Sequence, residues 1–223
     1  MRSLHRSFKW FRSGCGLIIG GTLMTACSLI SNIPVVSDER LDSLVLSDAR
    51  QILAAADPRA DVAYYRFRLS AFPRSDLLGL STGSGRIYIS LKLAQLASQS
   101  AYHRWMLRQT LAHEIAHELA GHAHQHGALA NTASAANGFS AHDLGVIAPV
   151  RFQNYSVEKE LQADLFGLRY WGELGWNCTI WVDILRQFEK SNYTGDIYHP
   201  TDRRLEQASK TCAALRSTSA MRY

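Results

Sequence analysis

Two histidines four residues apart, with a glutamate directly after the first, lie in the middle of this 223-residue chain: His113, Glu114 and His117. In a helix, residues four apart lie on one face, so both imidazoles can bind a single Zn²⁺ at about 2.0–2.1 Å. Glu114 lies beside the ion rather than on it, which is the position of a general base for a zinc-activated water. The alternative is a solvated helix whose His and Glu side chains contact each other one turn apart.

A catalytic zinc site needs a third protein ligand and an open fourth position. A later segment supplies Glu160 and Asp164, again four residues apart on one helical face. Glu160 can complete the site, while Asp164 can accept a hydrogen bond from a ligand histidine and hold its ring in place. The spacing therefore predicts one Zn²⁺ per chain, bound by His113, His117 and Glu160.

These side chains can meet only if helices carry them. Hydrophobic periodicity, with capping and breaker residues at the ends, predicts helices over 37–56, 91–126, 156–175, 178–191 and 201–216. Strands are expected over 62–70 and 86–90, with a turn at 81–85. Few strands among many helices predict an α+β fold that is mostly helical.

Taken together, the motifs resemble the HtpX-like zinc metallopeptidases related to the CAAX prenyl proteases, in particular periplasmic lipoproteins of the BepA and LoiP type. The resemblance covers about residues 80–210 and rests on His-Glu-Ile-Ala-His at 113–117, Tyr-Ser at 155–156, Glu160, Ala-Asp at 163–164, Gly167 and His-Pro at 199–200. It implies a zincin-like gluzincin domain with a small edge-stranded sheet. His113, His117 and Glu160 are then the zinc ligands. Glu114 is the catalytic acid and base, and His199 lies near the metal, where in some relatives it keeps the enzyme latent.

The segment 85–90 resembles the edge strand of that family. The resemblance implies that Arg86, Ile87, Tyr88 and Ile89 pair main chain to main chain with a substrate, which gives little side-chain selectivity. The alternative is an ordinary paired strand. The Asn-Ala-Phe-Ala type of sequence that often precedes the edge strand is replaced here by Leu-Gly-Leu-Ser-Thr at 78–82.

The first 26 residues have the three parts of a secretory signal peptide: basic residues, an apolar run and small residues, followed by Cys27. The run is too short for a membrane-spanning helix, which needs about 20 apolar residues. Residues 23–27 resemble a bacterial lipobox, so lipidation of Cys27 is expected to anchor the chain to a membrane. Ser28 is typical of sorting to the periplasmic face of the outer membrane. The alternatives are cleaved secretion and a structural N-terminal helix.

Composition predicts a single globular domain after this N-terminus. The expected parts are a lipoprotein signal peptide at 1–26, a lipidated N-terminus and first helix at 27–60, and a zinc metallopeptidase domain at 61–223. Apolar residues make up 47% of the chain and charged residues 19%, which excludes disorder. The net charge of +5 includes four cations in the first 26 residues. The nearly neutral remainder argues against a nucleic-acid partner.

Three further predictions concern cysteines, a histidine and a loop. Cys178 and Cys212 are expected to form a disulfide in an oxidising compartment, the alternative being two buried thiols. His122 follows His117 by five residues, about 140° further round a continued helix, and is expected to point away from the ligands. The segment 127–154 is expected to be a loop that covers the cleft.

The expected function is a zinc-dependent endopeptidase of the bacterial envelope that hydrolyses damaged or misassembled envelope proteins, a substrate class taken from the resemblance. The rival function is a latent or inactive metallopeptidase-like lipoprotein that acts as a chaperone for outer-membrane proteins. A periplasmic metal buffer is a third alternative. Glu114 favours hydrolysis, because neither a scaffold nor a buffer needs a base beside the metal.

Overall fold

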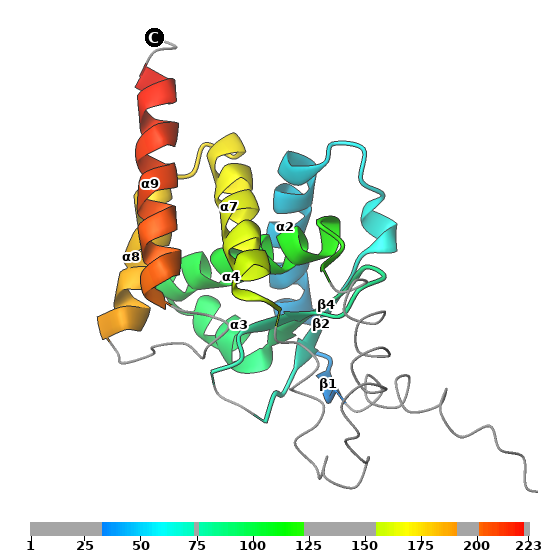
Figure 1. Cartoon of the computed structure of the whole chain (residues 1–223). Coiled ribbons are helices and arrows are strands. Elements are labelled where there is room, and N and C mark those ends of the chain that lie inside the picture. Colours follow the sequence, from blue (N-terminus) through cyan, green and yellow to red (C-terminus); the bar gives the residue numbers. More distant parts are fainter. Residues whose placement is uncertain (1–32, 74–75, 123–154, 191–200, 221–223) are drawn as a thin grey trace, which may run out of the picture.

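The computed structural model describes residues 33–73, 76–122, 155–190 and 201–220. This part of the chain forms six helices and one four-stranded mixed sheet (Figure 1). The helices are α2 (Glu39–Ala56), α3 (Leu91–Ala97), α4 (Ala101–Leu119), α7 (Val157–Glu173), α8 (Cys178–Lys190) and α9 (Thr201–Ala220). The strands are β1 (Val35–Val36), β2 (Arg66–Ser70), β3 (Gly79–Ser81) and β4 (Arg86–Ser90). The predicted α+β, mostly helical class is confirmed.

The order of the strands corrects one prediction. The sheet runs β1-β2-β4-β3, with β4 parallel to β2 and antiparallel to β3. The strand that carries Arg86, Ile87, Tyr88 and Ile89 is therefore internal, and the expectation that it is an edge strand is wrong. It is an ordinary paired strand, bonded to β2 on one side and β3 on the other, which was the alternative prediction. Among the described residues the two edges are β1 and β3, and the three residues of β3 are too few to show a period-two pattern in the sequence.

Two predicted elements are divided in the structure. The helix expected over 91–126 breaks at 98–100, because the Ser100 side chain caps a new helix by accepting from the His103 N–H at 3.5 Å. The strand expected over 62–70 begins only at residue 66. Before it, the Asp61 carboxylate accepts from the Ala63 N–H and caps a short 3₁₀ turn, Val62–Tyr64. Among the described residues, no helix is long and apolar enough to cross a bilayer.

Helix α4 is the centre of the core, since it packs against α2, α3, α7 and strand β3. Every residue from Leu111 to Glu118 is buried. A helix surrounded on so many sides has no polar face at its C-terminal half, so its titratable side chains lie in the interior. This burial excludes the solvated-helix alternative, because His113 is 8% exposed and His117 only 1%.

Close packing brings α7 against α4. A Cβ on Gly167 would lie 2.7 Å from the Trp181 ring and 3.2 Å from the Ala112 backbone, so only glycine permits this approach. Trp171 and Trp181 fill the space beside it and are fully buried. The contact places the N-terminal half of α7 next to the histidines of α4.

The predicted disulfide is present. Cys178 at the start of α8 is bonded to Cys212 in α9, with Cα atoms 5.5 Å apart. Helices α8 and α9 pack along each other, and α9 also packs on α7 (Figure 1). The bond therefore ties the last helix to the body of the domain.

Candidate metal centre

Three buried donor atoms from two helices converge on one point. The Nε2 atoms of His113 and His117 lie 3.0 Å apart. Oε2 of Glu160 lies 3.1 Å from the first and 3.5 Å from the second. Two ligands that each lie 2.0–2.1 Å from a tetrahedral zinc are about 3.3 Å apart. The three separations and the His, His, Glu donor set therefore fit a metal ion such as zinc.

Burial and the neighbouring carboxylates move the pKa values of the two histidines in opposite directions. Burial alone lowers the pKa of His113, but hydrogen bonds to Asp164 and Glu160 outweigh it and raise that pKa to about 10. Burial lowers the pKa of His117 to about 3, and the charge on His113 adds to the effect. One imidazolium and one neutral imidazole thus face the Glu160 carboxylate. A pocket that holds a proton between these groups is suited to a metal cation.

Asp164 holds His113 from behind. Its Oδ1 accepts a hydrogen bond from His113 Nδ1 at 2.9 Å, so the Nε2 of that ring faces the metal position. Arg204 of α9 binds the same carboxylate with two donors, Nε to Oδ2 at 2.6 Å and Nη2 to Oδ1 at 2.8 Å. Burial raises the pKa of Asp164, but Arg204 and His113 outweigh burial and keep it well below the usual range. Asp164 is therefore ionised whenever the protein is folded.

Glu114 follows His113 in α4 and lies against strand β3. Its side chain is 8% exposed. A Cβ placed on Gly79 of β3 would lie 2.8 Å from Glu114 Cγ and 3.0 Å from its Oε1. The carboxylate predicted to be the general base is therefore in close reach of the strand backbone.

The main chain of β3 has one side directed away from the sheet. Backbone hydrogen bonds join Ser90 to Leu78 and Thr82 to Arg86 at the two ends of the β3–β4 pair. Since hydrogen-bonded pairs alternate in antiparallel strands, the peptide groups of Gly79 and Ser81 point outward from β4. Of these two residues, Gly79 lies against Glu114, so the strand next to the predicted base is β3 and not β4.

Glu118, which the sequence analysis did not assign, fixes the turn between β3 and β4. Its carboxylate accepts from the Ser81 hydroxyl at 2.7 Å and from the Gly85 N–H at 2.6 Å. The turn needs glycine, because Gly85 has φ 73° and a Cβ there would lie 2.5 Å from the Tyr64 carbonyl oxygen. The signal in the sequence is an acidic residue four positions after Glu114, which lies on the same face of the helix.

Tyr155 links the edge strand to a metal ligand. Its ring stacks on His117, with centroids 4.0 Å apart and planes inclined by 19°. Its hydroxyl donates to the Ser81 carbonyl oxygen at 3.0 Å. Burial raises the pKa of this phenol well above its usual value, so Tyr155 remains a neutral donor. Tyr155 therefore fixes the distance between β3 and His117.

His122 does not point away from the ligands, and that prediction is wrong. Helix α4 ends at Leu119, and Gly121 adopts the left-handed conformation with φ 66°. The chain turns back there, so the rotation expected for a continued helix does not apply. The His122 Nδ1 lies 2.9 Å from His117 Nδ1, and its ring is 2% exposed.

Several predicted features lie outside the described residues. These are the signal peptide with Cys27, the loop 127–154, and His199. Within the described part, the structure brings His113, His117, Glu160 and Asp164 together, and it places Glu114 against Gly79 of β3. It does not bring Arg86, Ile87, Tyr88 and Ile89 to the metal position as an edge strand.

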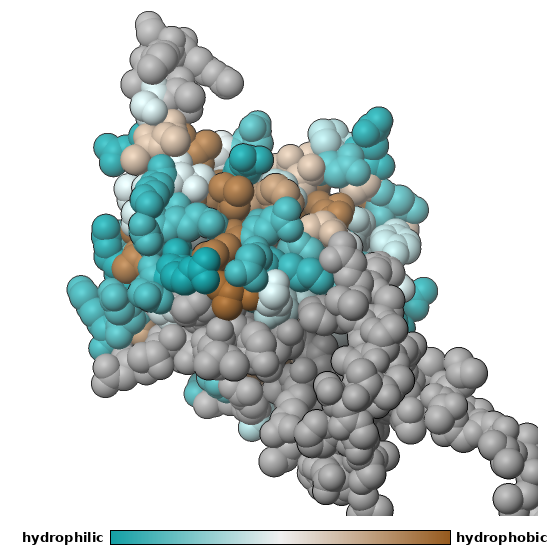
Figure 2. All heavy atoms as spheres, viewed as in Figure 1, coloured by the Kyte–Doolittle hydropathy of each residue, from teal (hydrophilic) through white to brown (hydrophobic). Residues whose placement is uncertain are grey.

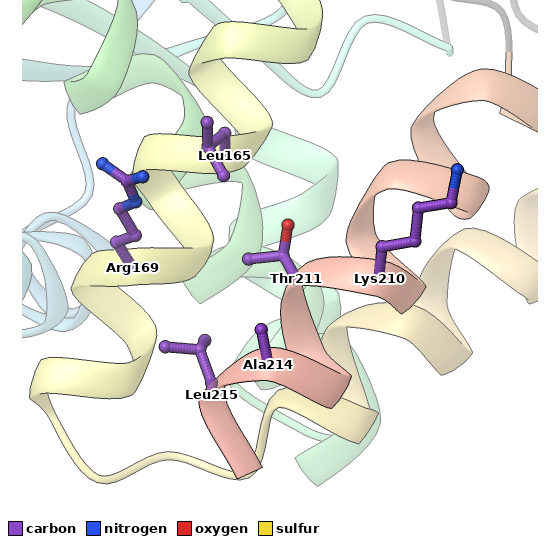
Figure 3. A pocket seen from close by; sticks show the side chains of 6 residues that line it. All are labelled: Leu165, Arg169, Lys210, Thr211, Ala214 and Leu215. Carbon is purple, nitrogen blue, oxygen red and sulfur yellow. The ribbon is translucent and has the colours of Figure 1, made fainter. Parts of the chain in front are cut away.

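Apolar side chains also form a groove elsewhere, on the face where α7 and α9 meet (Figure 2). The groove has a volume of about 390 Å³ and is lined by Leu165, Arg169, Lys210, Thr211, Ala214 and Leu215 (Figure 3). Its lining holds no histidine, cysteine or carboxylate. The groove therefore offers no imidazole, thiolate or carboxylate that could bind a metal.

No protein-family model matches this chain, and a search of curated proteins also finds no match. The functional assignment accordingly depends on the chemistry of the site.

Proposed function

We propose that this protein is a zinc-dependent endopeptidase of the HtpX-like type. The observation that carries the proposal is the convergence of His113, His117 and Glu160 in the interior, with Glu114, the residue after His113, lying against strand β3. A structural zinc site is normally closed by four protein ligands, whereas three ligands and a neighbouring carboxylate are typical of a hydrolytic site.

The residues around the ligands have distinct roles in the proposed reaction. When bound, zinc supplies a Lewis acid that polarises a carbonyl and lowers the pKa of water to about 7. Glu114 accepts the proton from that water and passes it to the amine of the departing peptide. Asp164 keeps the His113 ring in its orientation. By resemblance to the family, His199 is proposed to lie near the metal.

The proposed substrate is an extended peptide that adds a strand to β3. The N–H and C=O of Gly79, beside Glu114, and the N–H of Ser81 point outward from β4 and are suited to antiparallel pairing, while the Ser81 carbonyl accepts from Tyr155. Because such pairing reads the main chain, it selects for unfolded conformation more than for sequence. This supports damaged or misassembled envelope proteins as the substrate class.

The proposed location is the periplasmic face of the outer membrane, with a lipid anchor at Cys27. Support comes from the lipobox-like sequence before Cys27 and from the Cys178–Cys212 disulfide, which is typical of an oxidising compartment.

The test is to purify the full chain in detergent, measure its zinc content, and follow cleavage of unfolded casein. One zinc per chain is expected, with cleavage abolished by a chelator. Glu114→Gln should retain the zinc and lose at least about 100-fold in rate, since proton transfer contributes about 10²–10⁴-fold. Glu158→Gln, an exposed glutamate of α7, is the matched control and should cleave normally. Full activity of Glu114→Gln would exclude the assigned mechanism.

A further inference from the structure

The Nδ1 atoms of the two proposed histidine ligands contact different partners. His113 donates to the Asp164 carboxylate, whereas His117 contacts His122, which in turn contacts Gln162 of α7. From this geometry we propose that His122 and Gln162 are positioning residues, which set the tautomer of His117 so that its Nε2 lone pair faces the metal. The inference rests on the proposed zinc site and adds two residues to it.

The direction of each hydrogen bond follows from the amide. Oε1 of Gln162 can only accept, and it lies 2.8 Å from His122 Nε2, so that nitrogen carries the proton. In a neutral imidazole the other nitrogen then has a lone pair. His122 Nδ1, 2.9 Å from His117 Nδ1, therefore accepts a hydrogen bond from it. His117 is protonated on Nδ1, and its Nε2 is left as a metal ligand.

The opposite orientation of the amide would give the opposite result. If the Gln162 NH₂ group donated to His122, the proton positions in both rings would reverse, and His117 would present an N–H to the metal position. A carboxylate at residue 162 can only accept, so as long as His122 stays neutral it would enforce the productive order. This difference makes the chain of hydrogen bonds testable by substitution.

The surrounding structure leaves His122 little freedom. The left-handed Gly121 directs it back toward α4, and its ring centroid lies 5.0 Å from that of His117. Tyr155 covers the face of His117. A neutral histidine behind one ligand and a carboxylate behind the other also limits the negative charge near the metal. The remaining positive charge of the bound cation is thereby available to polarise a carbonyl.

The first test is the zinc affinity of the full chain in detergent, measured by competition with a chelating dye. Gln162→Leu is expected to weaken zinc binding about 10-fold or more, as is usual when a partner behind a metal ligand is lost. Gln162→Glu is expected to bind zinc at least as tightly as the unaltered chain. Gln51→Leu, an exposed glutamine of α2, is the matched control and should change nothing. Far-UV circular dichroism should be the same for all variants, since Gln162 is exposed on one side.

The second test observes the tautomer itself, by ¹H–¹⁵N NMR of histidine-labelled, metal-free protein. The proton of His117 is expected on Nδ1 in the unaltered chain and in Gln162→Glu. In Gln162→Leu, a mixture of the Nδ1 and Nε2 tautomers is expected. A proton on Nε2 in the unaltered chain, or equal zinc affinity in Gln162→Leu, would overturn the inference. Absence of zinc binding by the unaltered chain would instead overturn the proposed function. The tautomer measurement uses metal-free protein, so it can be read whether or not the chain binds zinc.

Discussion

Gly79 and Glu114 are in such close contact that a methyl group on Gly79 would lie 2.8 Å from Cγ of Glu114. The same methyl group would lie 2.6 Å from Cγ2 of Thr110, one helical turn earlier in α4. The backbone of β3 therefore lies directly against Glu114, the proposed base, and this short separation is possible because Gly79 has no side chain.

Gly79→Ala is expected to lower peptide hydrolysis by about 10- to 100-fold, because a displacement of about 1 Å of a catalytic group can cost that much. Zinc content should not change, since neither residue binds the metal. The measurement is casein cleavage together with metal analysis. Gly172→Ala is the matched control, since its Cβ would meet only Leu215 at 3.5 Å. Normal cleavage by Gly79→Ala would mean that Glu114 adjusts without loss.

Arg204→Leu is expected to destabilise the protein by about 3 kcal/mol, because the buried Asp164 carboxylate loses the guanidinium that binds it with two donors and keeps only His113. Zinc affinity should also fall about 10-fold, since Asp164 positions His113. Urea unfolding and zinc competition measure the two effects. Arg203→Leu, at the exposed neighbouring position, should leave both unchanged. Equal effects of the two substitutions would contradict the pairing.

Metal-free protein is expected to hold an imidazolium at His113 and a neutral imidazole at His117. The pKa of His113 is raised to about 10 and that of His117 lowered to about 3, from an ordinary value of 6.5. The stability that His113 contributes is therefore complete below pH 6.5 and is lost as the pH rises toward 10. NMR titration of chelator-treated protein and urea unfolding at several pH values test this. Deprotonation of His113 near pH 6.5 would contradict it.

Replacing both Cys178 and Cys212 by serine is expected to lower the free energy of unfolding by about 4 kcal/mol. The estimate comes from the loop entropy of a bond that spans 34 residues. Thermal unfolding with and without reductant provides the comparison. The double variant should be insensitive to reductant, and a native chain that is equally insensitive would show that the bond does not form.

Much of the site could be predicted because helical spacing is local. His113 with His117, and Glu160 with Asp164, each lie four residues apart, so one helix brings each pair to one face. The helices themselves were predicted to within a few residues over 39–56, 157–173, 178–190 and 201–220. The disulfide was also predicted correctly.

The remaining features depend on tertiary contacts that leave no periodic signal. The edge strand is three residues long, and which strand lies at the edge depends on pairing across the sheet. The position of His122 depends on the left-handed Gly121, which ends the helical rotation on which the prediction relied. Arg204 reaches Asp164 across 40 residues of sequence, so no spacing rule could identify it.

The disulfide has a further consequence if the chain cuts polypeptides as proposed. Lys190 ends α8 and Thr201 begins α9, and both lie between the bonded cysteines. A self-inflicted cut anywhere in the connection between those helices would leave two fragments still joined by a covalent bond. Helix α9 would remain docked, and with it Arg204 on Asp164. Under oxidising conditions, such a nicked molecule would keep its metal ligands in place and would migrate as one chain until reduced.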